Sequence, residues 1–284
     1  MPDSRTGTLF LVATPIGNLE DITFRALRVL RECDLVAAED TRHTARLLNH
    51  YDVRTPTTSV HEHNEPARIA GLVAKLTAGS RIALVSDAGT PGVSDPGFKL
   101  VRAAIAAGVR VEAIPGPSAV LTALSASGLP TDSFVFVGFP PARKAARETW
   151  FRALKDQRRT LVFFEAPHRI RESLEAARLV LGDRDISVCR ELTKIHEELV
   201  RGPISAVLGR LGEERGEFTV VMSGDPPPSA GPDPAQTSDE AVFAAFSAAV
   251  DGGLDRREAL KSVADALGLR SRDVYAAIER ARRS

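Results

Sequence analysis

The sequence predicts an α/β protein made of two α/β domains and a small helical unit at the C-terminal end. Short β-branched or aliphatic segments alternate with amphipathic helical segments over residues 7–224, which is typical of a mostly parallel sheet with crossover helices. A proline-rich stretch then interrupts this alternation, and three segments with apolar residues at helical spacing follow it. Together these observations predict two α/β domains, a linker and a helical tail.

The first expected domain covers residues 1–117. Its strands are predicted at four apolar segments, residues 8–13, 34–38, 81–86 and 110–114. Amphipathic helices are predicted at residues 20–32, 42–50, 65–78 and 96–107. Because a helix separates each pair of consecutive strands, we expect a mostly parallel sheet.

The same pattern begins again in the second expected domain, residues 118–224. After a helix at residues 117–127, strands are predicted at residues 133–138, 159–164, 186–190 and 218–222. Residues 225–238 contain five prolines and no apolar period, which is typical of an extended linker. This second domain is therefore expected to end near residue 224.

The tail, residues 239–284, is predicted to form three helices. The turn Leu267-Gly268-Leu269 separates the last two, and Arg270 and Arg272 enter the final helix, as in a helix-turn-helix that binds nucleic acid. The alternative is a small bundle used for packing or dimerisation. Residues 270–284 hold five arginines and two acidic residues, which favours contact with RNA.

The composition limits the classes of partner and compartment. Lys plus Arg equals Asp plus Glu at 37 each, so a polyanion must be met by local basic patches rather than by the net charge. Cys33 and Cys189 lie far apart, which predicts neither a disulfide framework nor a zinc site. The longest early apolar segment is far shorter than the roughly 18 residues of a membrane span. We expect a soluble cytoplasmic protein that binds no metal and no membrane.

Two loops of small residues are the strongest candidates for a ligand site. Residues 86–97 follow a predicted strand and contain three glycines and two prolines, and residues 114–119 form a second loop of this kind. Glycines let backbone amides approach a small molecule, and ligands of open α/β sheets bind beyond the carboxyl ends of the strands. The alternative is a pair of ordinary helix-capping turns, which would account for Asp95 and Pro117 but not for residues 86–92.

Polar side chains after the second strand are candidates for proton transfer. Glu39, Asp40, Arg42 and His43 lie within five consecutive residues, and a carboxylate there could take a proton from a hydroxyl group. Alternatively, Asp40 only caps the helix that follows, and the other side chains are solvated. His61 and His63 are two residues apart, which does not match the helical spacing of zinc ligands, so this segment is expected to be a polar loop facing the substrate.

Two arginines on a predicted helix are a further candidate for contact with phosphate groups. Arg143 and Arg147 lie on one face of a predicted helix and form a candidate phosphate-binding surface, although a solvated helix would show the same pattern.

The sequence has no phosphate-binding P-loop, no dinucleotide-binding glycine motif after the first strand and no nucleophile elbow. Kinase, dehydrogenase and hydrolase functions therefore lose their main support.

Six motifs, taken together and in order, resemble those of the bacterial small-subunit ribosomal RNA methyltransferase I family, a branch of the tetrapyrrole methylase superfamily. The resemblance covers about residues 7–224, and the tail resembles an extension found on many members. The motifs are ATPIGNL at residues 13–19, AEDTR at 38–42, SDAGTP at 86–91, IPGPSA at 114–119, FEAPHR at 164–169 and GEFTVV at 216–221.

This resemblance implies a methylase fold with the cofactor S-adenosylmethionine in a cleft between the two α/β domains of a homodimer. It implies 2′-O-methylation of a cytidine ribose in 16S rRNA at the decoding centre, with the rRNA or the 30S subunit as partner. The superfamily's usual first motif, Gly-x-Gly-Pro-Gly-Asp, is replaced here by Ala-Thr-Pro-Ile-Gly-Asn. This departure fits the rRNA branch.

The resemblance also suggests which residues carry each role. The cofactor-binding residues it implies are Ile16, Ser86, Asp87, Thr90, Ser118, Ala119, Glu165 and Leu192.

Because a ribose hydroxyl is a weak acid, a nearby base should help the reaction, and the candidates, in order, are Asp40, Glu39 and His61. The residues expected to bind RNA are Arg42, Arg143, Arg147, Arg169, Arg270 and Arg272. Two other functions stay open at this point: methylation of a tetrapyrrole or another small molecule, and a non-catalytic RNA-binding assembly factor.

Overall fold

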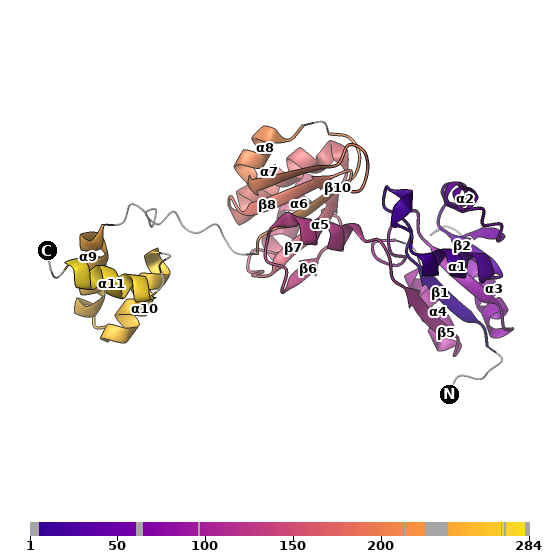
Figure 1. The fold of residues 1–284 in the computed structure, drawn as a ribbon, viewed down its shortest axis with the longest axis horizontal. Helices are drawn as coiled ribbons and strands as arrows, with labels where there is room; N and C mark the ends of the chain where they lie inside the picture. The colour runs from indigo at the N-terminus through magenta and orange to yellow at the C-terminus, as the bar shows by residue number, and fades with distance from the viewer. Residues whose placement is uncertain are drawn as a thin grey trace. The chain divides into compact units, whose positions relative to one another are not determined.

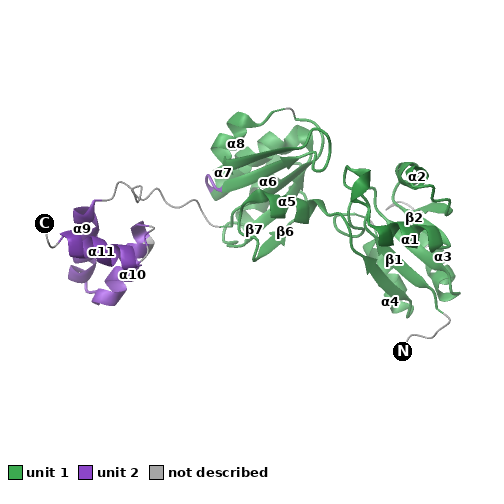
Figure 2. Cartoon of the chain, viewed as in Figure 1, with its two compact units in different colours: residues 1–181, 185–224 green, residues 182–184, 225–284 purple. Residues whose placement is uncertain are grey.

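The computed structural model describes residues 6–60, 65–95, 97–212, 214–224, 238–267, 269 and 271–281. The chain separates into two compact units, residues 1–181 with 185–224 and residues 182–184 with 225–284 (Figure 2). Both sheets belong to the first unit. The expected boundary after residue 117 stays a prediction, and the expected linker lies outside the described residues except for Ser238.

The first sheet is entirely parallel, in the order β3-β2-β4-β1-β5 (Figure 1). Its strands are β1 (Thr8–Val12), β2 (Leu35–Ala38), β3 (Thr57–Ser59), β4 (Arg81–Val85) and β5 (Arg110–Ile114). The four predicted strands are present. β3 was not predicted, because this edge strand is short, polar and partly exposed and so carries no apolar signal.

Helices cover both faces of this sheet. They are α1 (Phe24–Glu32), α2 (Thr41–His50), α3 (Glu65–Thr77) and α4 (Phe98–Ala106), and a short 3-10 turn, η1 (Leu19–Asp21), precedes α1. Along β1, Phe10 packs in one core cluster, with α1 and α2, while Leu9 packs in the other, with α3 and α4. Two apolar faces on one strand are expected where helices cover a parallel sheet on both sides.

The second sheet is mixed, in the order β6-β7-β10-β8-β9. Its strands are β6 (Phe134–Phe136), β7 (Thr160–Glu165), β8 (Asp185–Arg190), β9 (Glu198–Pro203) and β10 (Phe218–Met222). Only β6 and β7 pair in parallel, because β10 runs opposite to both of its neighbours and β9 returns from β8 antiparallel. The expectation of a mostly parallel sheet is therefore wrong for this half.

Four helices pack on the second sheet: α5 (Ala119–Ser127), α6 (Lys144–Ala153), α7 (Ile170–Leu181) and α8 (Ile204–Arg210). A 3-10 turn, η2 (Pro167–Arg169), leads into α7. Val220 of β10 belongs to the core cluster of α6, α7 and α8, whereas Val221 belongs to the cluster of α5. That second cluster also contains Ile16 and Leu192, so the loop after β1 packs against residues of the second sheet.

The second unit contains α9 (Asp239–Asp251), α10 (Arg256–Leu267) and α11 (Ser271–Ala281). Its core includes Val242 and Phe246 of α9 together with Val274 and Ile278 of α11. At the surface, the Arg280 guanidinium donates two hydrogen bonds, of 2.7 and 2.8 Å, to the Asp239 carboxylate. Gly268 and Arg270, at the expected turn, lie outside the described residues.

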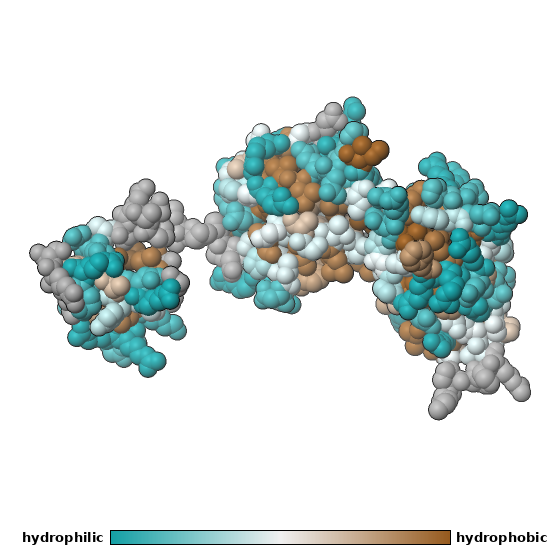
Figure 3. Space-filling view, in the orientation of Figure 1, coloured by the Kyte–Doolittle hydropathy of each residue, from teal (hydrophilic) through white to brown (hydrophobic). Residues whose placement is uncertain are grey.

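The surface of the first unit carries hydrophobic patches among hydrophilic areas (Figure 3). Phe24 and Ile195 are 95% and 97% exposed. Within the described ranges, no helix combines the length and apolar character that a membrane crossing requires.

Candidate active site

The loops that follow β1, β4 and β5 meet at the carboxyl edge of the first sheet. Thr14 and Gly89 exchange backbone hydrogen bonds of 2.9 and 3.0 Å, and the Thr14 hydroxyl donates to the Ser86 carbonyl at 3.2 Å. The Thr90 hydroxyl donates to the Pro117 carbonyl at 3.4 Å. Gly89 has a φ of 76°, a conformation that glycine adopts without strain. These contacts hold the two expected ligand loops in one place.

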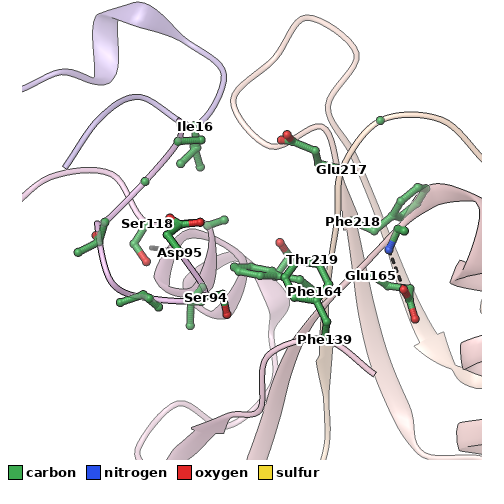
Figure 4. A pocket seen from close by; sticks show the side chains of 18 of the residues that line it. Ile16, Ser94, Asp95, Ser118, Phe139, Phe164, Glu165, Glu217, Phe218 and Thr219 are labelled. Atoms are coloured by element: carbon green, nitrogen blue, oxygen red, sulfur yellow. Dashed lines mark hydrogen bonds between the residues drawn. The ribbon is translucent and has the colours of Figure 1, made fainter. Parts of the chain in front are cut away.

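A cavity of about 320 Å³ lies beside these loops (Figure 4). This cavity, called here the donor cavity, is lined by the loops that follow strands of the first sheet, by the start of α5 and by residues of the second sheet. Ile16, Asp95 and Ser118 lie on one side of it, and Phe139 and Phe164 lie on the other. Its volume and its mixture of apolar walls with a few polar groups fit a small-molecule site.

Five of the eight expected cofactor residues line the donor cavity, namely Ile16, Thr90, Ser118, Ala119 and Glu165. Ser118 also caps α5, because its hydroxyl accepts a hydrogen bond from the Leu121 amide. Leu192 is 7% exposed and packs in the same apolar cluster as Ile16. Ser86 and Asp87 line a neighbouring cavity instead.

The Glu165 side chain lines the donor cavity, but its carboxylate is engaged elsewhere. It accepts a 2.7 Å hydrogen bond from the Ala166 amide, forms a 2.7 Å ion pair with Arg169 and accepts a hydrogen bond from the Ser173 hydroxyl. Figure 4 shows it on the far side from Ile16 and Ser118. Its carboxylate therefore anchors the turn between β7 and η2.

Several lining residues were not predicted. Phe139, Phe164 and Val93 supply apolar wall, and Thr219 supplies a hydroxyl. The ring of Phe164 contacts that of Phe139 at a centroid distance of 5.4 Å. Phe139 comes three residues after the end of β6 and is 51% exposed. An aromatic residue near a strand end was the available signal, but its ring partner Phe164 lies on another strand.

The neighbouring cavity, called here the basic cavity, has a volume of about 350 Å³. Ile16, Ala88 and Glu217 line both cavities and so form the wall between them. The remaining lining residues are Thr14, Pro15, Gly17, Leu19, His43, Thr44, Arg46, Leu47, Ser86, Asp87 and Lys194.

Carboxylates gather at the ends of β2 and β4. Burial raises the pKa of Glu39, and the negative charges of Asp95 and Asp87 raise it further. Burial likewise raises the pKa of Asp95, with a further contribution from Asp87. Within the described ranges, no group of acidic, histidine or cysteine side chains could hold a metal ion.

Asp40 is poorly suited to accept a proton. Its carboxylate caps α2 by accepting the Arg42 amide at 2.8 Å, and it binds the Arg42 guanidinium at 2.8 and 3.2 Å. Hydrogen bonds from Arg42 lower its pKa to about 2. Of the two carboxylates, Glu39 has the pKa that is better suited to accepting a proton. His61, the third candidate, lies outside the described residues.

The expected RNA-binding arginines differ in exposure and in their partners. Arg42 is 89% exposed and paired with Asp40, Arg143 is exposed at the start of α6, and Arg272 is 71% exposed in the second unit. Arg270 lies outside the described residues.

Two of the arginines are held by carboxylates. RNA binding by Arg147 stays a prediction, but its side chain is only 2% exposed, and its guanidinium donates hydrogen bonds to the Ala142 carbonyl and to Glu172. Arg169 is 20% exposed and paired with Glu165.

Comparisons with known proteins agree with this arrangement. The sequence model of the tetrapyrrole (corrin/porphyrin) methylases matches residues 8–208. The chain belongs to this family. The structure is similar to that of a solved uroporphyrin-III-C-methyltransferase from Thermus thermophilus, with a TM-score of 0.56 and 24% identity over 77% of this chain and 94% of that one. This likeness confirms the predicted fold.

Curated relatives place the chain in one branch of the family. It is 45% identical to ribosomal RNA small subunit methyltransferase I of Halalkalibacterium halodurans, over 95% of this chain and 93% of the relative. It is 50% identical to the protein of the same name in Pseudomonas aeruginosa, over 77% and 79% of the two chains. The family resemblance seen in the motifs is confirmed, and this chain is a methyltransferase.

Proposed function

We propose that this protein methylates the 2′-oxygen of a cytidine ribose in 16S rRNA, at the decoding centre of the small ribosomal subunit, with S-adenosylmethionine as methyl donor. The relatives that are 45% and 50% identical carry the name of a small subunit rRNA methyltransferase, and this observation carries the proposal. A homodimer acting in the cytoplasm belongs to the same proposal. Large exposed apolar side chains such as Phe24 and Ile195 support the dimer.

The residues of the donor cavity fit this cofactor. Ile16 and Phe164 offer apolar surface for an adenosyl group, and Ser118 and Thr90 offer hydroxyls. The charged side chains that line the cavity in the described part of the chain are all acidic. Glu165 and Glu217 are paired with Arg169 and Lys194, so the attraction for a cationic ligand rests on Asp95. When bound, S-adenosylmethionine supplies a methyl group on a positively charged sulfur.

The chain itself supplies orientation, shielding and proton acceptance. Because Ile16 and Ala88 line both cavities, a nucleotide in the neighbouring cavity would lie beside the donor cavity, and correct placement can lower a barrier by about 7 kcal/mol or more. Apolar lining excludes water, which favours a reaction that removes charge. Among the expected bases, Glu39 is our first candidate, since its raised pKa suits it to hold the hydroxyl proton.

The test is methyl transfer from labelled S-adenosylmethionine to 30S subunits and to naked 16S rRNA, followed by mapping of the modified nucleotide. We expect one 2′-O-methylated cytidine. Ala119, which lines the donor cavity, gives a matched pair of variants: Ala119→Trp fills the cavity and should abolish transfer, whereas Ala119→Ser should keep it. Binding of S-adenosylhomocysteine, measured by calorimetry, should be lost only in the Trp variant.

Other outcomes point to the other functions. Transfer to a tetrapyrrole but to no RNA would indicate a small-molecule methyltransferase. RNA binding without transfer to any acceptor, in protein that binds the donor, would indicate a non-catalytic assembly factor.

A further inference from the structure

The basic cavity has no role in donor binding as proposed above, yet it adjoins the donor cavity directly. Ile16, Ala88 and Glu217 line both. The two cavities therefore share part of their lining. Group transfer requires reacting atoms about 3–3.5 Å apart, and adjoining cavities suit a donor and an acceptor that must meet.

The two cavities differ in which charged side chains line them. Those described along the donor cavity are Asp95, Glu165 and Glu217. The basic cavity adds His43, Arg46 and Lys194, and it is also lined by the carboxylates of Asp87 and Glu217. Because Lys194 is paired with Glu217 and His43 lies beside Asp87, the attraction of this cavity for a phosphate-bearing acceptor rests mainly on Arg46.

The basic side chains are not equally available. Lys194 is held by Glu191 at 2.8 Å and by Glu217 at 3.1 Å. The His43 ring is 51% exposed and lies 3.8 Å from the Asp87 carboxylate. Arg46 is exposed and makes no hydrogen bond or ion pair with any residue that the structure describes. Arg46 is therefore the guanidinium that is free to meet a phosphate.

Thr44 gives a second, independent indication of a ligand. It lines the basic cavity and is 4% exposed, and its hydroxyl has no hydrogen-bond partner among the described residues. A buried polar group left unpaired costs about 1–3 kcal/mol, so a ligand oxygen that bonds to it would recover this free energy. Arg46 and His43 lie three residues apart on α2, which places them on the same side of the helix.

We propose that the basic cavity binds the acceptor nucleotide, with its phosphate at Arg46 and His43 and its ribose near Thr44 and Asp87. This inference deepens the proposed function and depends on it. It moves phosphate recognition from Arg42, whose guanidinium is occupied by Asp40, to Arg46 one turn later on α2. It also assigns Asp87 to the acceptor side, since that residue lines this cavity and not the donor cavity.

The test compares Arg46→Gln with Arg28→Gln in the full-length protein. Arg28 is a matched control, because it is 61% exposed on α1 and loses only an ion pair with Glu32. We expect Arg46→Gln to raise the KM for 30S subunits at least fivefold, and the affinity for S-adenosylhomocysteine to stay within twofold of wild type. Arg46→Lys should restore part of the RNA affinity, since the charge remains but the bidentate geometry is lost.

The dependence on salt gives a second readout. Loss of one phosphate contact should reduce the slope of log affinity against log salt by about 0.7 to 0.9, and Arg28→Gln should leave it unchanged. If the wild-type protein methylates RNA and the two Gln variants behave alike, this assignment is wrong while the proposed function stands. If the wild-type protein methylates no RNA, the proposed function fails and the assignment fails with it.

Discussion

The ion pair of Glu165 and Arg169 allows a quantitative test of what holds the turn at the donor cavity. Its side chains are 0% and 20% exposed and 2.7 Å apart, and the Arg169 Nε already lacks a partner within the described residues. Glu165→Ala would leave the guanidinium without its counter-charge in a mostly buried position. Removing one partner of a buried pair costs about 3–5 kcal/mol, a large part of a typical stability of about 5–15 kcal/mol.

Urea unfolding followed by tryptophan fluorescence measures this cost directly. Trp150 is the single tryptophan of the chain and packs against Phe151 and Phe163 of the second sheet's core. We expect Glu165→Ala and Arg169→Ala each to lower the free energy of unfolding by several kcal/mol. The double variant should lose clearly less than the sum, because the two groups interact.

An exposed pair provides the control. Arg54 and Asp52 are 87% and 81% exposed, so Arg54→Gln should cost about 1 kcal/mol or less. The reasoning fails if Glu165→Ala costs no more than this control. A large loss of S-adenosylhomocysteine affinity at unchanged stability would show that Glu165 contacts the donor and does not anchor the turn.

Two further predictions concern the site. Because burial and the neighbouring carboxylates raise the pKa of Glu39, ionisation of this side chain destabilises the folded protein. Glu39→Gln should therefore stabilise the protein at pH 7, and thermal denaturation should show that this gain vanishes as the pH falls toward the ordinary pKa of 4.5. The same variant should show reduced methyl transfer. Gly89→Ala forces an alanine into a φ of 76°, at a strain of about 1–2 kcal/mol, and should weaken S-adenosylhomocysteine binding measured by calorimetry. Gly253→Ala is the control, because this glycine also has a positive φ but lies in the helical unit. Equal affinities of the two variants would contradict this prediction.

The sequence alone was sufficient to predict those strands and loops that a local residue pattern specifies. The strands β1, β2 and β4 of the first sheet are mostly buried apolar segments, so their apolar pattern predicted them. Glycine, proline and a capping residue after a strand favour a ligand loop, and residues of both loops predicted in this way line the donor cavity. The family resemblance, not local chemistry, implied the role of Ile16.

Tertiary structure decided what depends on partners that are distant in the sequence. Arg147 has the pattern of a surface residue but is buried, because Glu172 of another helix pairs with it. Asp40 and Glu39 are adjacent in the sequence, yet Arg42 lowers the pKa of one while burial and remote carboxylates raise the pKa of the other.

The second sheet is mixed because β10 lies between β7 and β8 and pairs antiparallel with both. The tertiary fold also places the basic cavity beside the donor cavity. Periodicity reports which side of an element is apolar. It does not report which strand pairs with which, or which charges meet, and those contacts determined this site.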